Sequence, residues 1–381
     1  MATAKKKKRF VIPGLLLRLI NIALILGLLL SYLAPYVPPD KFWMLAFFGL
    51  SYPFWAVSNV FFFFFWLFRK RIFALIPLIS LLLGFSVFLR HFQFSGCESS
   101  GVVDGKMRVM TYNVKHFINN NRGIPNNNNR QNLFAFIGAE EYDLICFQEF
   151  QSAGKNYKDI IPRVTQHTGL RNSALQNYLD YFDGKRIDAI VTYSRYPIIN
   201  TDKLKLGKKY FCLITDIKKG GDTIRVFNIH MQSIYFDDND LQWMIDVAEA
   251  KNNNKTLKDD SKKIMWKLRN GFKKRAKQSR DIAERIAHSP FPVIVCGDMN
   301  DTPSSYTYRK IKSELYDSYT TCGSGFGNTY AGVLPPIRID HIFSSKVLQC
   351  IDYKILKKHY SDHFPVTATF IVSPESIDEQ P

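Results

Sequence analysis

Residues Val293–Ser305 read VIVCGDMNDTPSS, an apolar run that changes abruptly into a polar turn. Successive β-branched and small apolar side chains predict a buried strand, and Gly297 marks its end. The polar residues that follow include Asp298 and Asn300, whose oxygen atoms suit a hard cation. The amide N–H groups of Asn300 can donate hydrogen bonds to a phosphate. This segment therefore predicts a strand of an α/β fold that ends in a functional site.

Seven further apolar runs predict strands, and helix-like stretches alternate with them. Ile264, Leu268, Phe272 and Ala276 recur every four residues, so Ser261–His288 is predicted to form one long amphipathic helix. The pattern indicates an α/β domain with several consecutive strands in its middle. The seven runs are Arg108–Val114, Leu144–Gln148, Ile187–Tyr193, Tyr210–Ile217, Thr223–His230, Arg338–Phe343 and Pro365–Ile371.

The composition divides the chain into two parts. Of 381 residues, 46% are hydrophobic and 22% charged, which is too apolar for a disordered chain and too charged for a protein that lies wholly in a membrane. Eleven basic residues and only Asp40 on the acidic side precede residue 96, so this stretch contributes +10 of the net charge of +18. We expect a membrane anchor at residues 1–94, a small, polar linker at 95–106 and a catalytic domain at 107–372, followed by a tail at 373–381.

Three apolar stretches of the anchor approach the roughly 20 residues that a spanning helix needs. They are Ile12–Tyr32, Phe42–Phe68 and Ile72–Leu89. A cleaved signal peptide is the less favoured reading, because two further apolar runs follow the first. Buried core helices of a soluble protein are disfavoured as well, because Phe61–Phe65 has no polar face.

The distribution of positive charge predicts the orientation. Basic residues cluster at Lys5–Arg9 and at Arg69–Arg71, and basic residues of short loops stay in the cytoplasm. An integral, multi-pass membrane protein with a cytoplasmic N-terminus and three crossings would carry its catalytic domain on the extracytoplasmic side. The six cysteines are scattered, and their spacing neither requires nor excludes disulfides there.

Several predicted strands end in polar side chains, as expected where an open α/β sheet collects its ligand and catalytic groups. These residues are Asn113, Glu149, His230, Asp298, Asn300, Asp340 and, just before the last strand, Ser361, Asp362 and His363. Carboxylate and amide oxygens suit Mg²⁺ or Mn²⁺, and the histidines suit a phosphate.

Seven motifs in order, MTYNVKHF, DLICFQEF, VTYSRYPI, FNIHMQS, VIVCGDMNDTPSS, RIDHIF and SDHFPV, closely resemble the endonuclease/exonuclease/phosphatase superfamily, which includes deoxyribonuclease I and exonuclease III-like enzymes. The resemblance covers about Met107–Val372. It implies a four-layer α/β sandwich, in which two packed β-sheets are flanked by helices, here preceded by three transmembrane helices.

The resemblance also implies roles. Glu149 would be the main Mg²⁺ or Mn²⁺ ligand with Asn113, and Asp362 would bind metal or position water. Asp340 would orient His363, which either activates water or holds the phosphate. Asp298 would orient or deprotonate the attacking water, and Asn300 and His230 would contact the phosphate. Arg195 would either support its loop or neutralise the phosphate.

The expected function is a membrane-anchored, Mg²⁺-dependent phosphoesterase, with a nuclease-like phosphodiesterase as first choice. The alternatives are a phospholipid head-group hydrolase of sphingomyelinase type, a phosphomonoesterase, or a non-catalytic binding module. The segment Lys251–Arg280 carries twelve basic and two acidic residues. It is interpreted either as a solvated helix face or as a binding surface for anionic lipid or nucleic acid.

Overall fold

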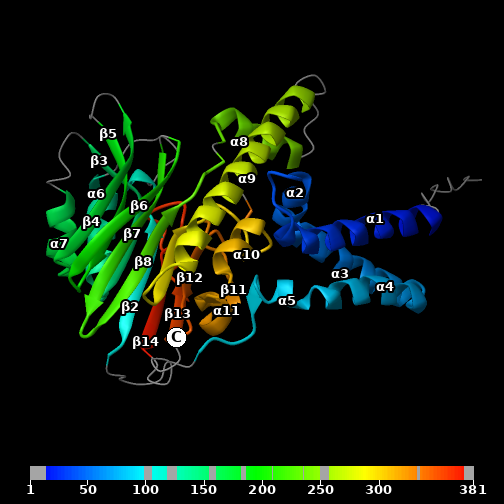
Figure 1. Cartoon of the computed structure of the whole chain (residues 1–381). Helices are drawn as coiled ribbons and strands as arrows, with labels where there is room; N and C mark the ends of the chain where they lie inside the picture. The colour runs from blue at the N-terminus through cyan, green and yellow to red at the C-terminus, as the bar shows by residue number, and fades with distance from the viewer. Residues whose placement is uncertain are drawn as a thin grey trace, which may run out of the picture.

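The structure is a computed structural model that describes residues 14–97, 105–117, 127–153, 160–181, 186–207, 209–234, 236–248, 257–332 and 335–372. Two six-stranded mixed sheets pack face to face, and helices cover their outer faces (Figure 1). This arrangement is the four-layer α/β sandwich that the resemblance implied.

The first sheet has the order β13-β14-β2-β3-β5-β4, and the second has the order β10-β12-β9-β8-β7-β6. Neighbours are antiparallel except for the parallel pairs β2–β3 and β8–β9. The strands of the first sheet are β13 (Leu348–Ile355), β14 (Val366–Val372), β2 (Met107–Asn113), β3 (Leu144–Ala153), β5 (Arg186–Ser194) and β4 (Asn172–Tyr181). Those of the second are β10 (Tyr316–Asp317), β12 (Asp340–Ser344), β9 (Val293–Asp298), β8 (Asp222–His230), β7 (Lys209–Lys219) and β6 (Ile198–Leu206).

The main core lies between the two sheets. It joins Val109 and Leu144 of the first sheet to Val226, Ile294 and Ile342 of the second, all of them fully or almost fully buried. Strands in such a core bury both faces and therefore have continuous apolar runs, which explains why the sequence predicted them.

Helices pack on the outer face of each sheet. On the first sheet lie α6 (Asn127–Gly138) and α7 (Ile160–Thr168), and on the second lie α9 (Leu257–Ala287) and α10 (Tyr306–Lys312). The long helix predicted at Ser261–His288 is confirmed as α9, with α8 (Asp238–Ala248) beside it. The remaining short elements are η2 (Lys115–Phe117) and α11 (Ser318–Cys322).

Three strands of eight or more residues were not predicted, namely β4, β6 and β13, and neither were the strands of two residues, such as β10. Each of the three longer strands lies at an edge of its sheet. The burial pattern of β6 shows why, since charged side chains alternate with partly buried ones and no residue of the strand is fully buried. Edge strands commonly carry charges that prevent pairing with other chains, so their sequences lack an apolar run.

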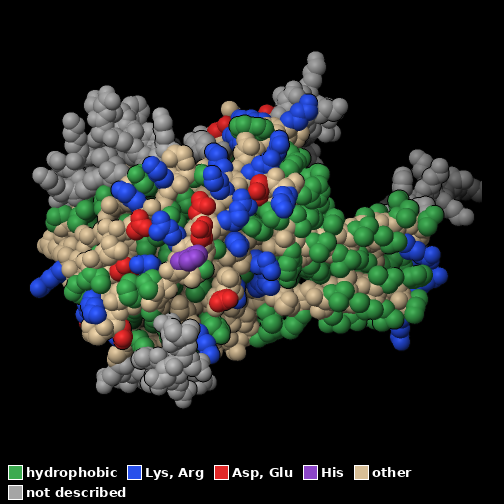
Figure 2. Space-filling model, in the orientation of Figure 1, with side chains coloured by type: hydrophobic (Ala, Val, Ile, Leu, Met, Phe, Trp, Pro, Cys, Tyr) green, Lys and Arg blue, Asp and Glu red, His purple; other side chains and the backbone are tan. Residues whose placement is uncertain are grey.

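The N-terminal part forms an extension that projects away from the sandwich (Figure 1). Its elements are α1 (Gly14–Leu33), η1 (Ala34–Tyr36), α2 (Met44–Leu50), α3 (Tyr52–Arg69), α4 (Arg71–Leu83) and α5 (Phe85–Phe88). Helix α1 packs against α3 and α4, with Trp66 donating a hydrogen bond to Asn21 at 3.0 Å. Figure 2 shows a largely hydrophobic surface on this extension, with basic side chains at its far end.

The expected number of three spanning helices is not found. In the part of the chain that the structure describes, one helix could cross a membrane by length and composition, Gly14–Tyr36 with 23 residues. A second would require counting α2 and α3, which meet at a bend of 62°, as one span. The run Phe42–Phe68 is divided because α2 packs on the catalytic domain, where Ala46 joins Ile264 and Phe272 of α9. The predicted span Ile72–Leu89 is interrupted at Gly84, which leaves α4 with 13 residues.

The extension is docked firmly on the domain. Arg280 of α9 donates two hydrogen bonds of 3.0 Å to Asp40, and the short strand β1 (Phe92–Gln93) pairs with β11 (Gly325–Phe326). A disulfide joins Cys97 to Cys322 of α11. The rest of the predicted linker, as far as residue 104, and the predicted tail at 373–381 lie outside the described residues.

Candidate active site

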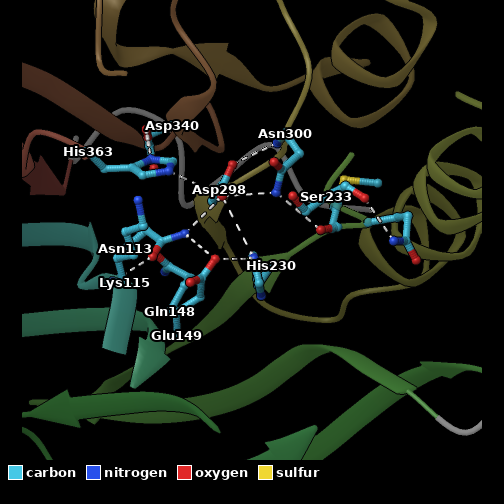
Figure 3. A network of polar contacts seen from close by, with 12 residues as sticks. Asn113, Lys115, Gln148, Glu149, His230, Ser233, Asp298, Asn300, Asp340 and His363 are labelled. Atoms are coloured by element: carbon cyan, nitrogen blue, oxygen red, sulfur yellow. Dashed lines mark hydrogen bonds and ion pairs between the residues drawn. The ribbon is translucent and has the colours of Figure 1, made fainter. Parts of the chain in front are cut away.

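The predicted polar residues converge at one end of the sandwich (Figure 3). Asn113 and Glu149 come from the first sheet, whereas His230, Asp298 and Asp340 come from the second. Pairing within the second sheet places its three residues side by side, because His230 is opposite Asp298 and Asp298 is opposite Asp340. Two sheets that pack face to face thus contribute to one cluster.

Glu149 owes its position to an irregularity in β3. The pairing of β3 with β5 shifts between Phe147 and Phe150, and Glu149 has φ +50°, in the left-handed region that few side chains adopt. A bulge redirects a side chain that a regular strand would point elsewhere. Backbone strain of this kind persists only where the surrounding structure enforces it, and it concentrates at functional sites.

Asn113 links the two acids of the cluster. Its Nδ2 donates to Oε1 of Glu149 at 3.1 Å and to Oδ2 of Asp298 at 3.0 Å. His230 completes this group, since its Nε2 lies 3.3 Å from Glu149 Oε1 and 3.8 Å from Asp298 Oδ2. The arrangement brings two carboxylates, one amide and one imidazole within contact of one another.

The strand that ends at Asp298 requires a glycine before it. Gly297 has φ +142°, and a Cβ there would lie 2.0 Å from the carbonyl oxygen of Ile229 on the neighbouring strand. Asp298 then accepts hydrogen bonds from the backbone N–H of Asn300 at 2.7 Å and from its Nδ2 at 2.9 Å. Asn300, with φ +52°, is thereby fixed beside Asp298.

His363 and Asp340 form a pair. Nδ1 of His363 lies 2.9 Å from Oδ2 of Asp340, and its Nε2 faces Asp298 at 3.9 Å. Both side chains are almost completely buried. A carboxylate on Nδ1 fixes the ring orientation and directs Nε2 into the cluster.

The electrostatics of the cluster shift three groups away from their ordinary pKa values. Burial alone would lower the pKa of His363, but the charges of Asp340 and Asp298 and the hydrogen bond to Asp340 raise it to about 10. Burial raises the pKa of Asp298 to about 6, an increase that the charge of His363 reduces and that of Asp340 reinforces. Burial alone would raise the pKa of Glu149, but its hydrogen bond to His230 and the charge of that histidine bring it well below the ordinary value.

The donor set fits a divalent cation. Ligand atoms of Glu149, His230 and Asp298 all lie within 4.8 Å of one another, and so do those of Asp298, Asp340 and His363. In addition, Oδ1 of Asp340 is buried and accepts no hydrogen bond from the described residues. Mg²⁺ and Mn²⁺ prefer the carboxylate and amide oxygens that Glu149, Asp298 and Asn113 supply.

Sequence reasoning missed several residues of the site. Lys115 and His116 follow Asn113 in a turn with positive φ, and Nε2 of His116 lies 3.3 Å from Glu149. Beneath the site, Gln148 donates to Asn228 of the opposite sheet at 2.7 Å, in a fully buried contact. The motifs MTYNVKHF, DLICFQEF and FNIHMQS contain these residues, but no spacing rule marks them as part of the site.

Two predicted site residues lie elsewhere or are otherwise engaged. Arg195 is not in the cluster, because Ser194 pairs with Leu144 at the start of β3, about 17 Å of strand from Glu149. Its Nε contacts Asp143 at 2.8 Å, so the structure gives no basis for the predicted phosphate contact. Asp362 lies beside the cluster but is paired with Lys115 at 2.6 Å, and it belongs to neither of the two ligand groups above.

Much of the basic charge of Lys251–Arg280 is neutralised within the molecule. Lys263 and Lys267 contact Asp237 and Asp240, and Arg275 is buried against Asp301 at 3.1 Å. Arg280 holds Asp40. Figure 2 shows the remaining basic side chains gathered over α9, and those exposed are Lys262, Arg269, Lys274 and Lys277. Residues 251–256 of this segment lie outside the described residues.

Comparison with protein-family models gives two matches. The model described as the endonuclease/exonuclease/phosphatase family matches residues 110–363, and one described as a domain of unknown function matches residues 5–91. No curated protein matches the chain. The first match contains all of the clustered residues.

Solved structures with the same fold are similar at low identity. An endonuclease/exonuclease/phosphatase family protein from Leptotrichia buccalis is 18% identical, with 69% of this chain and 98% of that chain covered and a TM-score of 0.46. The human Nocturnin catalytic domain with bound sulfate is 16% identical, with 71% and 96% covered and a TM-score of 0.47. A mannosyl-6-phosphatase from Bacteroides thetaiotaomicron is 17% identical, with 70% and 99% covered and a TM-score of 0.45.

Proposed function

Because the chain belongs to the endonuclease/exonuclease/phosphatase family, whose enzymes hydrolyse phosphoester bonds, we propose that it is a membrane-anchored phosphoesterase that depends on Mg²⁺ or Mn²⁺. The observation that carries this proposal is the convergence of Asn113, Glu149, Asp298 and the Asp340–His363 pair from two sheets. Such a set contains a cation site, a group to direct water and a group to hold phosphate.

Each residue has a role in this proposal. Glu149, Asn113 and Asp298 would hold the cation, which when bound would polarise the phosphoryl oxygens and stabilise the charge that develops on them. Asp298 orients the attacking water, and Asn300 keeps that carboxylate in place through its two hydrogen bonds. Asp340 holds the His363 ring so that Nε2 can donate a hydrogen bond to a phosphate oxygen.

The test is hydrolysis of a soluble diester, bis(p-nitrophenyl) phosphate, by the purified full chain in detergent. We expect turnover with Mg²⁺ or Mn²⁺, none with excess EDTA, and loss of turnover in His363→Ala. Turnover that EDTA leaves unchanged would contradict the cation requirement.

Membrane anchoring rests on the extension. Large apolar side chains are exposed along each of its three long helices, among them Leu15 (67%), Phe61 (64%) and Ile72 (68%). A soluble protein rarely exposes contiguous apolar surface on this scale. We infer that the extension is embedded in a lipid bilayer, with α1 as one crossing.

We propose that the N-terminus is cytoplasmic and the catalytic domain extracytoplasmic. The basic connection Arg69–Arg71 lies at the end of the extension remote from the domain (Figure 1), as the orientation rule for short basic loops requires. The disulfide between Cys97 and Cys322 favours the oxidising side of a membrane. The four free cysteines of the described residues are buried. In intact cells, a membrane-impermeant thiol reagent should therefore label a Lys205→Cys variant, whose new cysteine is exposed, and leave the wild-type protein unlabelled. Labelling that requires lysis would reverse this topology.

We propose that the exposed basic residues of α9 contact anionic lipid heads. Helix α2 of the extension packs on α9, which brings the helix close to the bilayer surface, and Trp266 is 62% exposed there. Tryptophan is typical of membrane interfaces. Replacing Arg269, Lys274 and Lys277 by Gln should weaken binding to vesicles that contain phosphatidylglycerol without changing diester turnover. If the wild type and the triple variant each bind the vesicles equally well at low and at high salt, this role would be contradicted.

A nuclease-like phosphodiesterase and a phospholipid hydrolase both remain compatible with the site itself. One observation favours the phospholipid hydrolase. Loops that leave the cluster continue to the place where the extension meets the domain, as Ser304 shows by its 2.9 Å contact with His91. A phospholipid in the bilayer would therefore lie closer to the active site than a nucleic acid in solution.

A further inference from the structure

A pocket lies between the extension and the catalytic domain. Its volume is about 310 Å³, at the small end of the range typical of ligand sites. Ala56 and Val57 of α3 and Phe88 of α5 line one side, and Phe326 and Ile337 of the domain line the other. The lining is mainly apolar, so the pocket suits a hydrocarbon group rather than a charged one.

Tyr52, His91, Thr302, Asn328 and Arg338 supply the polar part of the lining. Two of them, Thr302 and Asn328, belong to segments that also build the active site. Thr302 lines the pocket, and it lies two residues after Asn300 in the turn that follows β9. Asn328 also lines it, and two residues later Tyr330 forms a β-bridge with His363. The same two loops therefore border the pocket on one side and the catalytic cluster on the other.

Hydrogen bonds tie the segment that follows Asn328 to the strands and turns that carry Asp340 and His363. Thr329 Oγ1 accepts the N–H groups of Ile339 and Asp340, each at 3.0 Å, and its backbone carbonyl accepts the N–H of Phe364. Ala331 donates to the carbonyl of Asp362 at 2.7 Å. The wall of the pocket is thereby held in a fixed position relative to Asp340.

The other wall is continuous with the surface that we place in the bilayer. Val57 is 69% exposed although it lines the pocket, and its neighbour Phe54 is 59% exposed. Phe326, on the domain side, is 67% exposed. An apolar chain could therefore move from the bilayer along α3 into the pocket without crossing water.

We propose that this pocket receives the hydrocarbon chain of a lipid phosphoester, whose phosphate is then presented to the cluster of Asp298 and His363. The inference rests on the proposed phosphoesterase function and narrows its substrate to lipids. It gives the extension a part in substrate recognition in addition to anchoring.

The test uses n-dodecyl phosphate with a photoreactive diazirine at the end of its chain, added to the full-length protein in detergent with Mg²⁺. We expect cross-links to the pocket residues of α3 and of the segment around Ile337, and competition by unlabelled dodecyl phosphate but not by butyl phosphate. Val57→Trp fills the mouth of the pocket and should reduce labelling there at least fivefold. The matched control is Val60→Trp, which changes the same residue type on the same helix outside the lining and should leave labelling unchanged.

Labelling spread evenly over the exposed faces of α1, α3 and α4, or equal in the two Trp variants, would overturn the proposal. Turnover of bis(p-nitrophenyl) phosphate by the same preparations separates this failure from that of the proposed function. Lost pocket labelling with normal diester turnover contradicts only the lipid pocket. Specific labelling of a protein without turnover contradicts the phosphoesterase and leaves the pocket in place.

Discussion

The ion pair of Asp317 and Arg338 is buried so completely that removing one partner should strongly destabilise the domain. Arg338 donates to both carboxylate oxygens, at 3.1 and 2.7 Å, and both side chains are at most 1% exposed. Tyr308 donates to the same carboxylate at 2.7 Å, and Arg338 also donates to the carbonyl of Arg90 at 2.9 Å. Arg338 therefore connects the domain with the chain that leaves the extension, two residues before Asp340.

Asp317→Asn preserves the shape of the side chain but leaves the guanidinium of Arg338 buried without a counter-charge. Removing one partner of a buried pair costs about 3–5 kcal/mol. For a domain of roughly 250 residues each kcal/mol shifts the midpoint of thermal unfolding by about 2–4 °C, so the midpoint should fall by roughly 6–20 °C. The matched control is Asp202→Asn, because Asp202 pairs with Arg285 on the surface, where the side chains are 44% and 52% exposed. That substitution should cost about 0–1 kcal/mol.

The pH dependence follows from the pKa of Asp317. Burial alone would raise this pKa, but the charge and hydrogen bonds of Arg338 lower it below the ordinary value. A lowered folded-state pKa gives stability that is complete above the unfolded-state pKa, about 3.9, and is lost as pH falls through the folded-state value. The difference in the midpoint of thermal unfolding between wild type and Asp317→Asn should thus be the same at pH 7 and at pH 5.5. Thermal scans of the full chain in detergent measure it. A midpoint within 2 °C of wild type at pH 7, or a difference that disappears by pH 5.5, would refute this reasoning.

Three further predictions concern the site and the disulfide. Glu149→Gln should raise the Mg²⁺ concentration needed for half-maximal activity, with partial recovery in excess Mn²⁺; a metal titration with an unchanged midpoint would exclude Glu149 as a ligand. His363→Ala should lower kcat about 10²–10⁴-fold without rescue by added metal, and its combination with Asp340→Asn should cost far less than the product of the two single losses, since both act through one imidazole. Full metal rescue or multiplicative losses would contradict the pairing. The double variant Cys97→Ser with Cys322→Ser should be about 2–5 kcal/mol less stable than wild type under oxidising conditions and as stable as wild type in reductant. If the variant and the wild type unfold at the same midpoint in both conditions, the disulfide contributes nothing to stability.

The interior of the fold was predictable because burial on two faces leaves a clear pattern. The runs Leu144–Gln148 and Val293–Gly297 appear in the structure as parts of β3 and β9, in the centres of the two sheets. Edge strands lack this pattern. Strand β6 was not predicted for that reason, because charged residues occur along its length. Composition wrongly predicted one spanning helix over Phe42–Phe68. Hydropathy does not distinguish an apolar residue that packs on the domain, such as Ala46, from one that would face lipid.

The site was predictable to the extent that strands bring their terminal residues to one edge. Strands β8 and β9 end there, at His230 and Asp298, and the antiparallel β12 begins there, at Asp340. His230, Asp298 and Asp340 are adjacent through strand pairing alone. Arg195 lies away from the cluster because its strand runs antiparallel to β3, so that the end of that strand lies beside the start of β3. Its contacts with Asp143 and Tyr142 agree with the alternative role of supporting the loop. Strand direction is a property of the topology and is not encoded in a local motif.

The contact between the extension and the loop after β9 gives the anchor a consequence for the site. Gly49 of α2 approaches this loop so closely that a Cβ would lie 2.5 Å from the carbonyl oxygen of Ser304. His91, between α5 and β1, contacts the side chain of Ser304 at 2.9 Å and stacks on Tyr52 of α3. The loop that begins with Asp298 and Asn300 is thus held on its far side by the extension. Because a catalytic group must keep its geometry within about 0.5 Å, the contact with the extension helps to fix the position of Asp298, the carboxylate that we propose directs water.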